Sequence, residues 1–215
     1  MMTAIGNCAI AITLAGTAAA DARTLTLVAF GDSLTQGYGL PPEDGLVPQL
    51  EGWLRGKGAD VRVVNAGVSG DTTAGGAARI AWTLTPDVDA IIVTLGGNDL
   101  LRGIDPATSR ANLDAILTET DAHRLPVLLI GMSAPGNYGP EYKTAFDAIY
   151  PELAASHGAA LVGSFFAPLL AKGGDPASLA SFLQADGIHP NATGVQKIVE
   201  GLGPQVLNLL AKVDP

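Results

Sequence analysis

The sequence predicts an α/β fold, in which a parallel sheet of five strands lies between two layers of helices. Strand-like and helix-like segments alternate from residue 23 to the end of the chain. The strand-like segments are continuous apolar runs, as expected for strands that are covered on both faces. A helix between successive strands is the connection that parallel strands require. Together these observations favour a three-layer α/β/α sandwich.

Short apolar runs define the expected strands, which are Leu25–Phe30, Val61–Asn65, Ala90–Leu95, Val127–Gly131 and Ala159–Val162. Apolar residues at helical spacing between these runs predict helices at about 44–57, 73–84, 106–122, 141–157 and 191–212. Large aromatic residues on the apolar faces of these helices are expected in the core: Trp53, Trp82 and Phe146.

Several helix boundaries carry local signals. Asp105–Pro106 predicts a helix start as a cap followed by a first-turn proline, and Asn191 predicts another as a cap. Lys57–Gly58 and His157–Gly158 are typical of helix ends, where glycine adopts the left-handed conformation.

Composition and charge restrict the class of protein. The chain has 215 residues, of which 47% are hydrophobic and 15% are charged, so it can bury a substantial core and is not disordered. Without a repeat or a linker, residues 21–215 are expected to form a single domain. A net charge of −9 argues against nucleic acid and anionic membrane surfaces as partners.

Residues 1–20 are predicted to be a signal peptide. Ala9–Ala15 is an apolar run of suitable length, and Ala18–Ala20 offers small residues for cleavage. The run is too short to span a bilayer, so we expect a periplasmic or secreted protein without stable membrane insertion. No Lys or Arg precedes the run, which departs from the usual pattern, and a buried N-terminal helix is the alternative. The only cysteine, Cys8, lies in this segment, so the mature chain would need no disulfide.

Polar segments follow the first three predicted strands, and a fourth precedes the last helix. They are Gly31–Ser33, Asn65–Thr73, Gly96–Asp99 and Asp186–Pro190. The carboxyl ends of parallel strands lie at one edge of a sheet, where open α/β folds bind their ligands. We therefore expect these segments to meet there.

Ser33, His189 and Asp186 can form a catalytic series. A serine hydroxyl becomes a good nucleophile when a base takes its proton, and histidine suits that role near neutral pH. A carboxylate three residues before the histidine can fix its tautomer and stabilise its cation. Metal binding by Asp186 and His189 is the alternative, but no second His or Cys lies at ligand spacing, so we expect no metal.

Attack on a carbonyl creates an oxyanion that needs hydrogen-bond donors. The backbone N–H of Gly70 and the carboxamide of Asn98 are the candidate donors. Taken separately, Gly70 also fits an ordinary turn and Asn98 a helix cap. Asp32 and Asp99 flank the site and are expected to anchor its loops rather than to carry protons.

The four blocks resemble those of the SGNH (GDSL) hydrolase family, which carry Ser, Gly, Asn and His in that order. The similarity covers nearly all of residues 25–210, and four blocks in order are highly specific. Within the family, the chain is most similar to the periplasmic thioesterase I/lysophospholipase L1 and arylesterase branch. The segments that carry this closer similarity are Ser69–Thr72, Leu95–Gly103 and Asn137–Gly139.

The resemblance implies a flavodoxin-like sandwich of five parallel strands. It also implies that Ser33 is the nucleophile, His189 the base and Asp186 its orienting partner. The Ser33 N–H, the Gly70 N–H and the Asn98 side chain would form the oxyanion hole.

The expected activity is therefore hydrolysis of acyl esters and thioesters, such as aryl esters, acyl-CoA-like thioesters and lysophospholipids, without a cofactor. Apolar and small residues dominate the expected rim loops Gly37–Pro42, Leu100–Gly103 and Met132–Pro140, which suits an acyl chain. A carbohydrate or small-ester acetylesterase is the alternative. Two binding functions also share the fold: a flavodoxin-like flavin or nucleotide binder, and a catalytically dead binding protein. A flavin or nucleotide binder should have a glycine-rich phosphate loop after the first strand, and this sequence has none. A dead binding protein should have lost at least one of Ser33, Asn98, Asp186 and His189, and all four are present. A monomer is compatible with the sequence, which leaves the oligomeric state open.

Overall fold

The computed structural model describes residues 23–170 and 176–213 and contains one parallel five-stranded sheet. The strand order is β2-β1-β3-β4-β5. The strands are β1 (Leu25–Gly31), β2 (Val61–Gly67), β3 (Ala90–Thr94), β4 (Val127–Ile130) and β5 (Ala160–Val162). All five predicted strands are confirmed to within two residues at each end. The predicted signal peptide lies outside the described residues.

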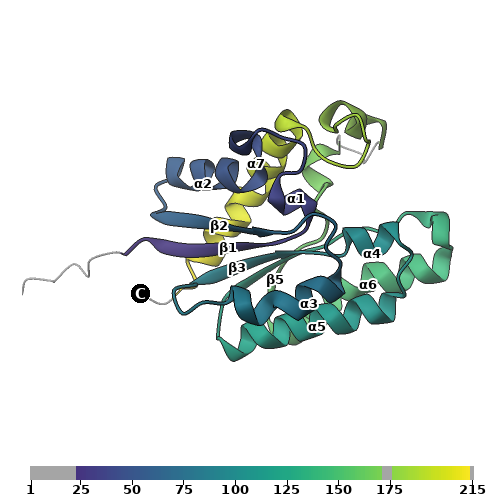
Figure 1. The fold of residues 1–215 in the computed structure, drawn as a ribbon, viewed down its shortest axis with the longest axis horizontal. Helices are drawn as coiled ribbons and strands as arrows, with labels where there is room; N and C mark the ends of the chain where they lie inside the picture. Colours follow the sequence, from purple (N-terminus) through teal and green to yellow (C-terminus); the bar gives the residue numbers. More distant parts are fainter. Residues whose placement is uncertain (1–22, 171–175, 214–215) are drawn as a thin grey trace, which may run out of the picture.

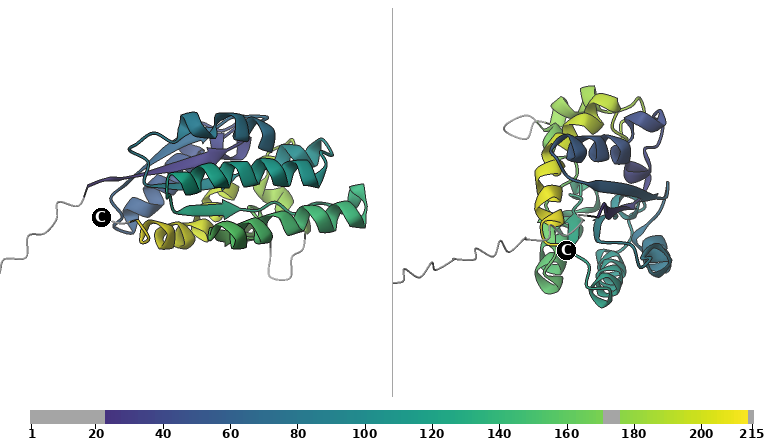
Figure 2. Two further views of the ribbon diagram at one scale, coloured as in Figure 1. Left: turned by 90° about the horizontal axis from the view of Figure 1, so that it is seen from below. Right: turned by 90° about the vertical axis from the view of Figure 1, so that its left-hand side faces the viewer.

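Helices cover the sheet on both sides, as Figure 1 shows, and the turned views in Figure 2 show the same layers. The long helices are α2 (Leu46–Gly56), α3 (Thr73–Thr83), α5 (Pro106–Ala122), α6 (Pro140–His157) and α7 (Ala192–Leu210). Helix α2 packs against α7 on one side, and α3 and α6 pack against α5 on the other (Figure 1). The predicted α/β/α sandwich is confirmed.

The predicted helix boundaries have the expected capping contacts. The Asp105 carboxylate accepts a hydrogen bond from the backbone of Ala107, and the Asn191 side chain accepts one from Gly194. Gly158 ends α6 with a φ of 65°, in the left-handed region. Short polar signals therefore define these boundaries locally.

The core lies around the three central strands, β1, β3 and β4, which are almost completely buried. The prediction that every strand is covered on both faces is wrong for the two edge strands, because β2 exposes Arg62 and β5 exposes Leu161. Phe146 is buried and Trp53 is partly buried, as expected. Trp82 is 86% exposed, so its assignment to the core is wrong: its part of α3 faces solvent.

Two short helices lie at the carboxyl ends of the strands, α1 (Ser33–Gln36) after β1 and α4 (Gly97–Leu101) after β3 (Figure 1). Short 3-10 helices complete the loops: η1 (Pro42–Asp44), η2 (Gly136–Tyr138), η3 (Ala167–Leu169) and η4 (Pro176–Phe182). Over the described ranges, 23–170 and 176–213, no helix is sufficiently long and apolar to cross a membrane.

Candidate active site

The turn between β1 and α1 places Ser33 at the carboxyl edge of the sheet. Strand β1 ends at Gly31, and Ser33 is the first residue of α1. Asp32 caps this short helix, since its Oδ1 accepts a hydrogen bond from the Leu34 backbone at 3.0 Å. The Ser33 side chain faces a cavity, although the residue is only 9% exposed.

His189 lies on a tight hairpin that approaches Ser33 from the other end of the chain. The Gln184 N–H donates to the His189 carbonyl at 2.7 Å, and Leu183 forms an antiparallel bridge with Pro190. The Gln184 side chain also donates to the carbonyls of Tyr38 and Pro190. Gln184 therefore links the histidine hairpin to the loop that follows α1 through side-chain hydrogen bonds.

Ser33, His189 and Asp186 form a hydrogen-bonded series. His189 Nε2 lies 2.8 Å from Ser33 Oγ, and His189 Nδ1 lies 2.7 Å from Asp186 Oδ2. Hydrogen bonds from the His189 ring, and from the backbones of His189 and Ile188, lower the pKa of Asp186 to about 2. An ionised carboxylate only accepts hydrogen bonds, so the imidazole proton lies on Nδ1 and Nε2 can accept the serine proton.

The loop after β2 places Gly70 on the wall of the same cavity. Gly70 has a φ of +79°, which residues with a side chain rarely adopt. Its carbonyl accepts a hydrogen bond from Arg102 at 2.8 Å. Gly67, earlier in this loop, lies so close to α1 that a Cβ would stand 2.3 Å from the Gln36 nitrogen. Gly67 thus allows the loop to lie against the Ser33 turn, and Gly70 allows the left-handed backbone at the cavity wall.

Asn98 on α4 also lines the cavity, and its Nδ2 lies 3.3 Å from Asp32 Oδ2. A carboxamide nitrogen carries two protons, and this contact uses one of them. Asp32 is 1% exposed, and burial raises the pKa of its carboxyl to about 6, against the opposing effect of its hydrogen bonds.

Asp99, the neighbour of Asn98, connects α4 to α3 and α5. It accepts hydrogen bonds from the Thr73 N–H at 2.9 Å, the Thr73 hydroxyl at 2.6 Å and the Ser109 hydroxyl at 2.9 Å. The carboxylate is fully buried and does not line the cavity. Its contacts fix the start of α3, just after the Gly70 loop, relative to Asn98.

The cavity above Ser33 has a volume of about 770 Å³ and mostly apolar walls. As expected, Tyr38, Leu101 and Tyr138 from the predicted rim loops line it. Arg102 does not line it and instead holds Gly70. The sequence reasoning missed a further wall between β5 and the histidine hairpin, which contributes Phe166, Leu170, Leu179 and Leu183. The only sequence signal for this wall is the presence of large apolar residues in a segment without a regular helix or strand pattern.

The structure brings the predicted site residues together at one edge of the sheet. Ser33, Gly70, Asn98, His189 and Asp32 line one cavity, Asp186 contacts His189, and Asp99 braces the loops behind them. In the described part of the chain, no three His, Cys, Asp or Glu side chains are grouped to hold a metal ion. Sequence reasoning did not identify Gln184 or Arg79, whose hydrogen bonds to backbone carbonyls have no sequence signature.

A serine that contacts a carboxylate-bound histidine, at the strand ends of an α/β/α sandwich, defines the class: a serine hydrolase. The model of the GDSL-like lipase/acylhydrolase family matches residues 29–197. The chain belongs to this family and is an ester-hydrolysing enzyme.

Named relatives span most of the chain. Esterase TesA from Pseudomonas aeruginosa is 40% identical over 88% of this chain and 92% of its own length. Thioesterase 1/protease 1/lysophospholipase L1 from Escherichia coli K12 is 35% identical over 90% of this chain and 86% of its own. The crystal structure of AlinE4, an SGNH-hydrolase family esterase, is 43% identical, has a TM-score of 0.71, and matches over 88% of this chain and 98% of its own.

Proposed function

We propose that the protein hydrolyses acyl esters and thioesters through an acyl-enzyme on Ser33. The observation that carries this proposal is the 2.8 Å contact between Ser33 Oγ and His189 Nε2 on the wall of a largely apolar cavity. His189 acts as general base and Asp186 orients it. The Ser33 N–H, the Gly70 N–H and the Asn98 amide form the oxyanion hole.

In the first half of the reaction, the Ser33 hydroxyl proton moves to His189 Nε2 while Oγ bonds to the substrate carbonyl carbon. The carbonyl electron pair moves onto the oxygen, and the hole stabilises the resulting oxyanion. Asp186, anionic because the pKa of its carboxyl is held near 2, stabilises the imidazolium. As the carbonyl re-forms, the bond to the alcohol or thiol breaks, and the leaving atom takes the proton from His189.

In the second half, a water molecule gives a proton to His189 and attacks the acyl-enzyme. The second oxyanion collapses, the acyl–Oγ bond breaks, and Ser33 recovers the proton from His189. The products are a free acid and the active enzyme. The cycle is the same for esters and thioesters, because the hole binds the developing oxyanion rather than the leaving atom.

The apolar walls of the cavity support an acyl chain as the group that binds beside Ser33. Phe166, Leu170, Leu179 and Leu183 form one wall, and Met132 and Tyr138 belong to another. A volume of about 770 Å³ lies within the usual range of small-molecule sites. Aryl esters, lysophospholipids and acyl thioesters all present such a chain.

A chain-length series tests the substrate class. Each buried methylene contributes about 0.8 kcal/mol, or roughly a fourfold gain, so kcat/KM for p-nitrophenyl esters should rise from acetate through several added carbons and then level off. Acyl thioesters of the same chains should show the same trend. If acetate were best and every longer chain worse, a carbohydrate or small-ester acetylesterase would replace this proposal.

Covalent labelling tests the nucleophile. A p-nitrophenyl phosphonate should inactivate the enzyme with one phosphonyl group, which mass spectrometry should locate on Ser33. Ser69, Ser133 and Ser164 also line the cavity and serve as internal controls. A label on any of these three serines, with Ser33 unmodified, would contradict the mechanism.

We also propose that residues 1–20 direct export and that residues 21–215 form the mature domain, on the basis of Ala9–Ala15 and Ala18–Ala20. Mass spectrometry of the exported protein should find an N-terminus between Asp21 and Arg23. An intact Met1 in a purely cytosolic fraction contradicts this proposal.

A further inference from the structure

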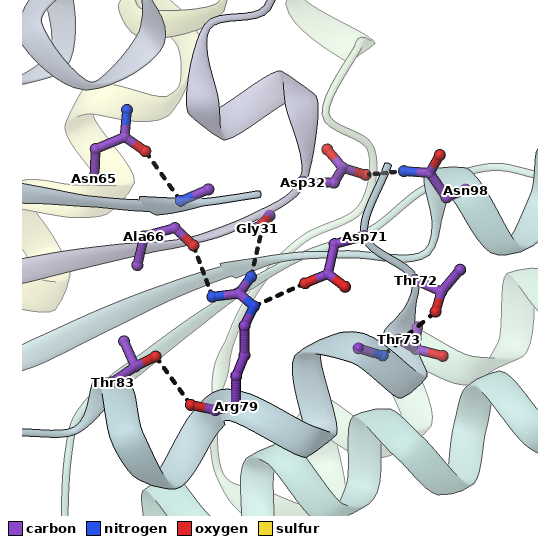
Figure 3. A network of polar contacts seen from close by, with 12 residues as sticks. Gly31, Asp32, Asn65, Ala66, Asp71, Thr72, Thr73, Arg79, Thr83 and Asn98 are labelled. Carbon is purple, nitrogen blue, oxygen red and sulfur yellow. Dashed lines mark hydrogen bonds and ion pairs between the residues drawn. The ribbon is translucent and has the colours of Figure 1, made fainter. Parts of the chain in front are cut away.

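The Arg79 side chain extends from α3 to the carboxyl ends of β1 and β2, where its guanidinium contacts three segments (Figure 3). Its Nη2 donates to the Gly31 carbonyl and its Nη1 to the Ala66 carbonyl, both at 2.9 Å. Its Nε donates to Asp71 Oδ2 at 2.7 Å. One planar group thus joins the ends of two strands and the loop after the second.

These contacts lie next to the two backbone segments that provide N–H donors to the proposed oxyanion hole, the Ser33 turn and the Gly70 loop. Gly31 lies two residues before Ser33, and Asp71 directly follows Gly70. A movement of the guanidinium would therefore change the separation between the Ser33 turn and the Gly70 loop. Arg79 does not line the cavity, so it acts on the site through these neighbours.

The surroundings of Arg79 hold it firmly in this position. Its guanidinium carbon lies 3.9 Å from the ring centre of Phe30, which is fully buried. The Arg79 side chain is 23% exposed and that of Asp71 11%, so their ion pair is largely shielded from water. A guanidinium offers donors in a fixed fork, which lysine cannot reproduce.

We propose that Arg79 is a positioning residue that sets the distance between the nucleophile turn and the Gly70 oxyanion donor. This inference rests on the proposed roles of Ser33 and Gly70. The oxyanion exists after attack begins, so a displaced donor weakens the transition state more than substrate binding. Loss of Arg79 should therefore lower kcat and change KM little.

Arg55 is a matched control at the other end of β2. Its Nε donates to the Val61 carbonyl at 2.9 Å, and its Nη1 lies 2.9 Å from Glu51 Oε1. Like Arg79, it joins a helix to a strand carbonyl and pairs with a carboxylate. Its contacts are at the amino end of the strand, far from Ser33 along β1 and β2. Arg55→Ala should therefore lower thermal stability without changing kcat.

The experiment compares Arg79→Lys, Asp71→Asn and Arg55→Ala with the full-length wild-type enzyme. We measure kcat and KM for p-nitrophenyl butyrate, the inactivation rate by a p-nitrophenyl phosphonate, and the unfolding midpoint. Arg79→Lys should reduce kcat and the inactivation rate roughly 10–100-fold, with KM within about threefold. Asp71→Asn should cause a smaller loss of the same kind, because it keeps both carbonyl contacts of Arg79. In the double variant Arg79→Lys/Asp71→Asn, the fold-loss in kcat should be smaller than the product of the two single fold-losses, because both changes act on one ion pair.

Several results would overturn the inference. One is a kcat for Arg79→Lys within about twofold of wild type, and another is a loss that lies wholly in KM. A third is a fall in kcat for Arg55→Ala as large as that for Arg79→Lys. If Arg79→Lys does not fold, unchanged kcat in folded Asp71→Asn overturns it. Phosphonate labelling of the wild-type enzyme separates failure of this inference from failure of the proposed function. A phosphonate on a residue other than Ser33 refutes both. A phosphonate on Ser33, together with an unchanged kcat in Arg79→Lys, refutes only the positioning role of Arg79.

Discussion

Asp89 at the amino ends of the strands and Asp32 at their carboxyl ends are both buried carboxylates in different surroundings. Asp89 pairs with Arg23 and accepts a hydrogen bond from the Thr26 backbone at 2.7 Å. The Arg23 hydrogen bond lowers the pKa of Asp89. Asp32 instead accepts hydrogen bonds from two neutral groups, and burial raises its pKa to about 6.

The opposite shifts have opposite consequences for stability. A lowered pKa means that Asp89 stabilises the fold above its ordinary pKa of 3.8 and that this contribution is lost as the pH falls through the lower folded value. For Asp32 the favourable contribution is present below 3.8 and is lost as the pH rises through about 6. At neutral pH the ionised Asp32 therefore lowers the free energy of unfolding. A buried charge retained beside Ser33 despite this effect is typical of a functional site.

The contrast predicts that a carboxyl-end variant can lose activity without losing stability. Ser33→Ala should lower kcat at least roughly a thousandfold, because the nucleophile is gone. Its unfolding midpoint should remain close to that of the wild type. Ser69→Ala, which removes another hydroxyl from the same cavity wall, should retain activity. Substantial turnover by Ser33→Ala would contradict the assignment.

Asn98→Ala tests whether the carboxyl end acts on the transition state. The loss of one oxyanion donor should lower kcat roughly a hundredfold and change KM little. Asn137→Ala removes a second carboxamide from the cavity wall and should have a much smaller effect. If the Asn98→Ala defect lay wholly in KM, Asn98 would position the substrate instead.

Asp32→Asn should affect activity and stability in opposite directions. The new amide places a donor opposite the Asn98 amide, so kcat should fall roughly tenfold as Asn98 loses its fixed orientation. Because the buried charge is gone, stability relative to the wild type should increase as the pH rises from 4 to 7. Urea unfolding at each pH measures this difference. A pH-independent difference would show that burial of the Asp32 charge does not destabilise the fold.

Asp89→Ala should give the reverse pattern at the amino end. The variant leaves the buried Thr26 N–H without its acceptor, which costs about 1–3 kcal/mol. The unfolding midpoint should fall by roughly 2–4 °C for each kcal/mol, while kcat at 25 °C stays within about twofold. A large fall in kcat for the folded variant would show that the two ends of the sheet are coupled.

The parts of the structure that sequence reasoning predicted well are those with local signals. The caps at Asp105 and Asn191 and the glycine at position 158 define helix boundaries through their nearest neighbours. The grouping of the four polar segments also follows from a simple rule, since parallel strands have their carboxyl ends at one edge.

The features that sequence reasoning missed depend on distant partners. Trp82 was assigned to the core because its helix is apolar, but exposure depends on which helix packs beside it. The edge position of β2 depends on strand order, which an apolar run does not encode. Arg79 bonds two backbone carbonyls, and every residue type offers this acceptor.

The smallest predicted effect is at the amino end, where His157 joins α6 to α5. Its ring nitrogens lie 2.6 Å from Asp121 Oδ2 and 2.9 Å from Asp114 Oδ1. Burial lowers the pKa of the imidazole, and the two carboxylates more than offset this, so its pKa is raised. Its contribution to stability is therefore fully present below the ordinary pKa of 6.5 and is lost as the pH rises through the folded value.

His157→Gln should thus reduce stability at pH 5.5 by about 0.2–1 kcal/mol, since both carboxylates are about half exposed, and by less at pH 9. His123→Gln is the control, because His123 has one carboxylate partner at 3.4 Å instead of two, and its effect on stability should be smaller. Urea unfolding at the two pH values measures both variants, and kcat should not change in either. A loss for His157→Gln that is equal at both pH values would mean that its packing, rather than its charge, joins the two helices. Of the ion pairs near the amino ends of the strands, that of Asp89 would then stabilise the fold and those of His157 would not.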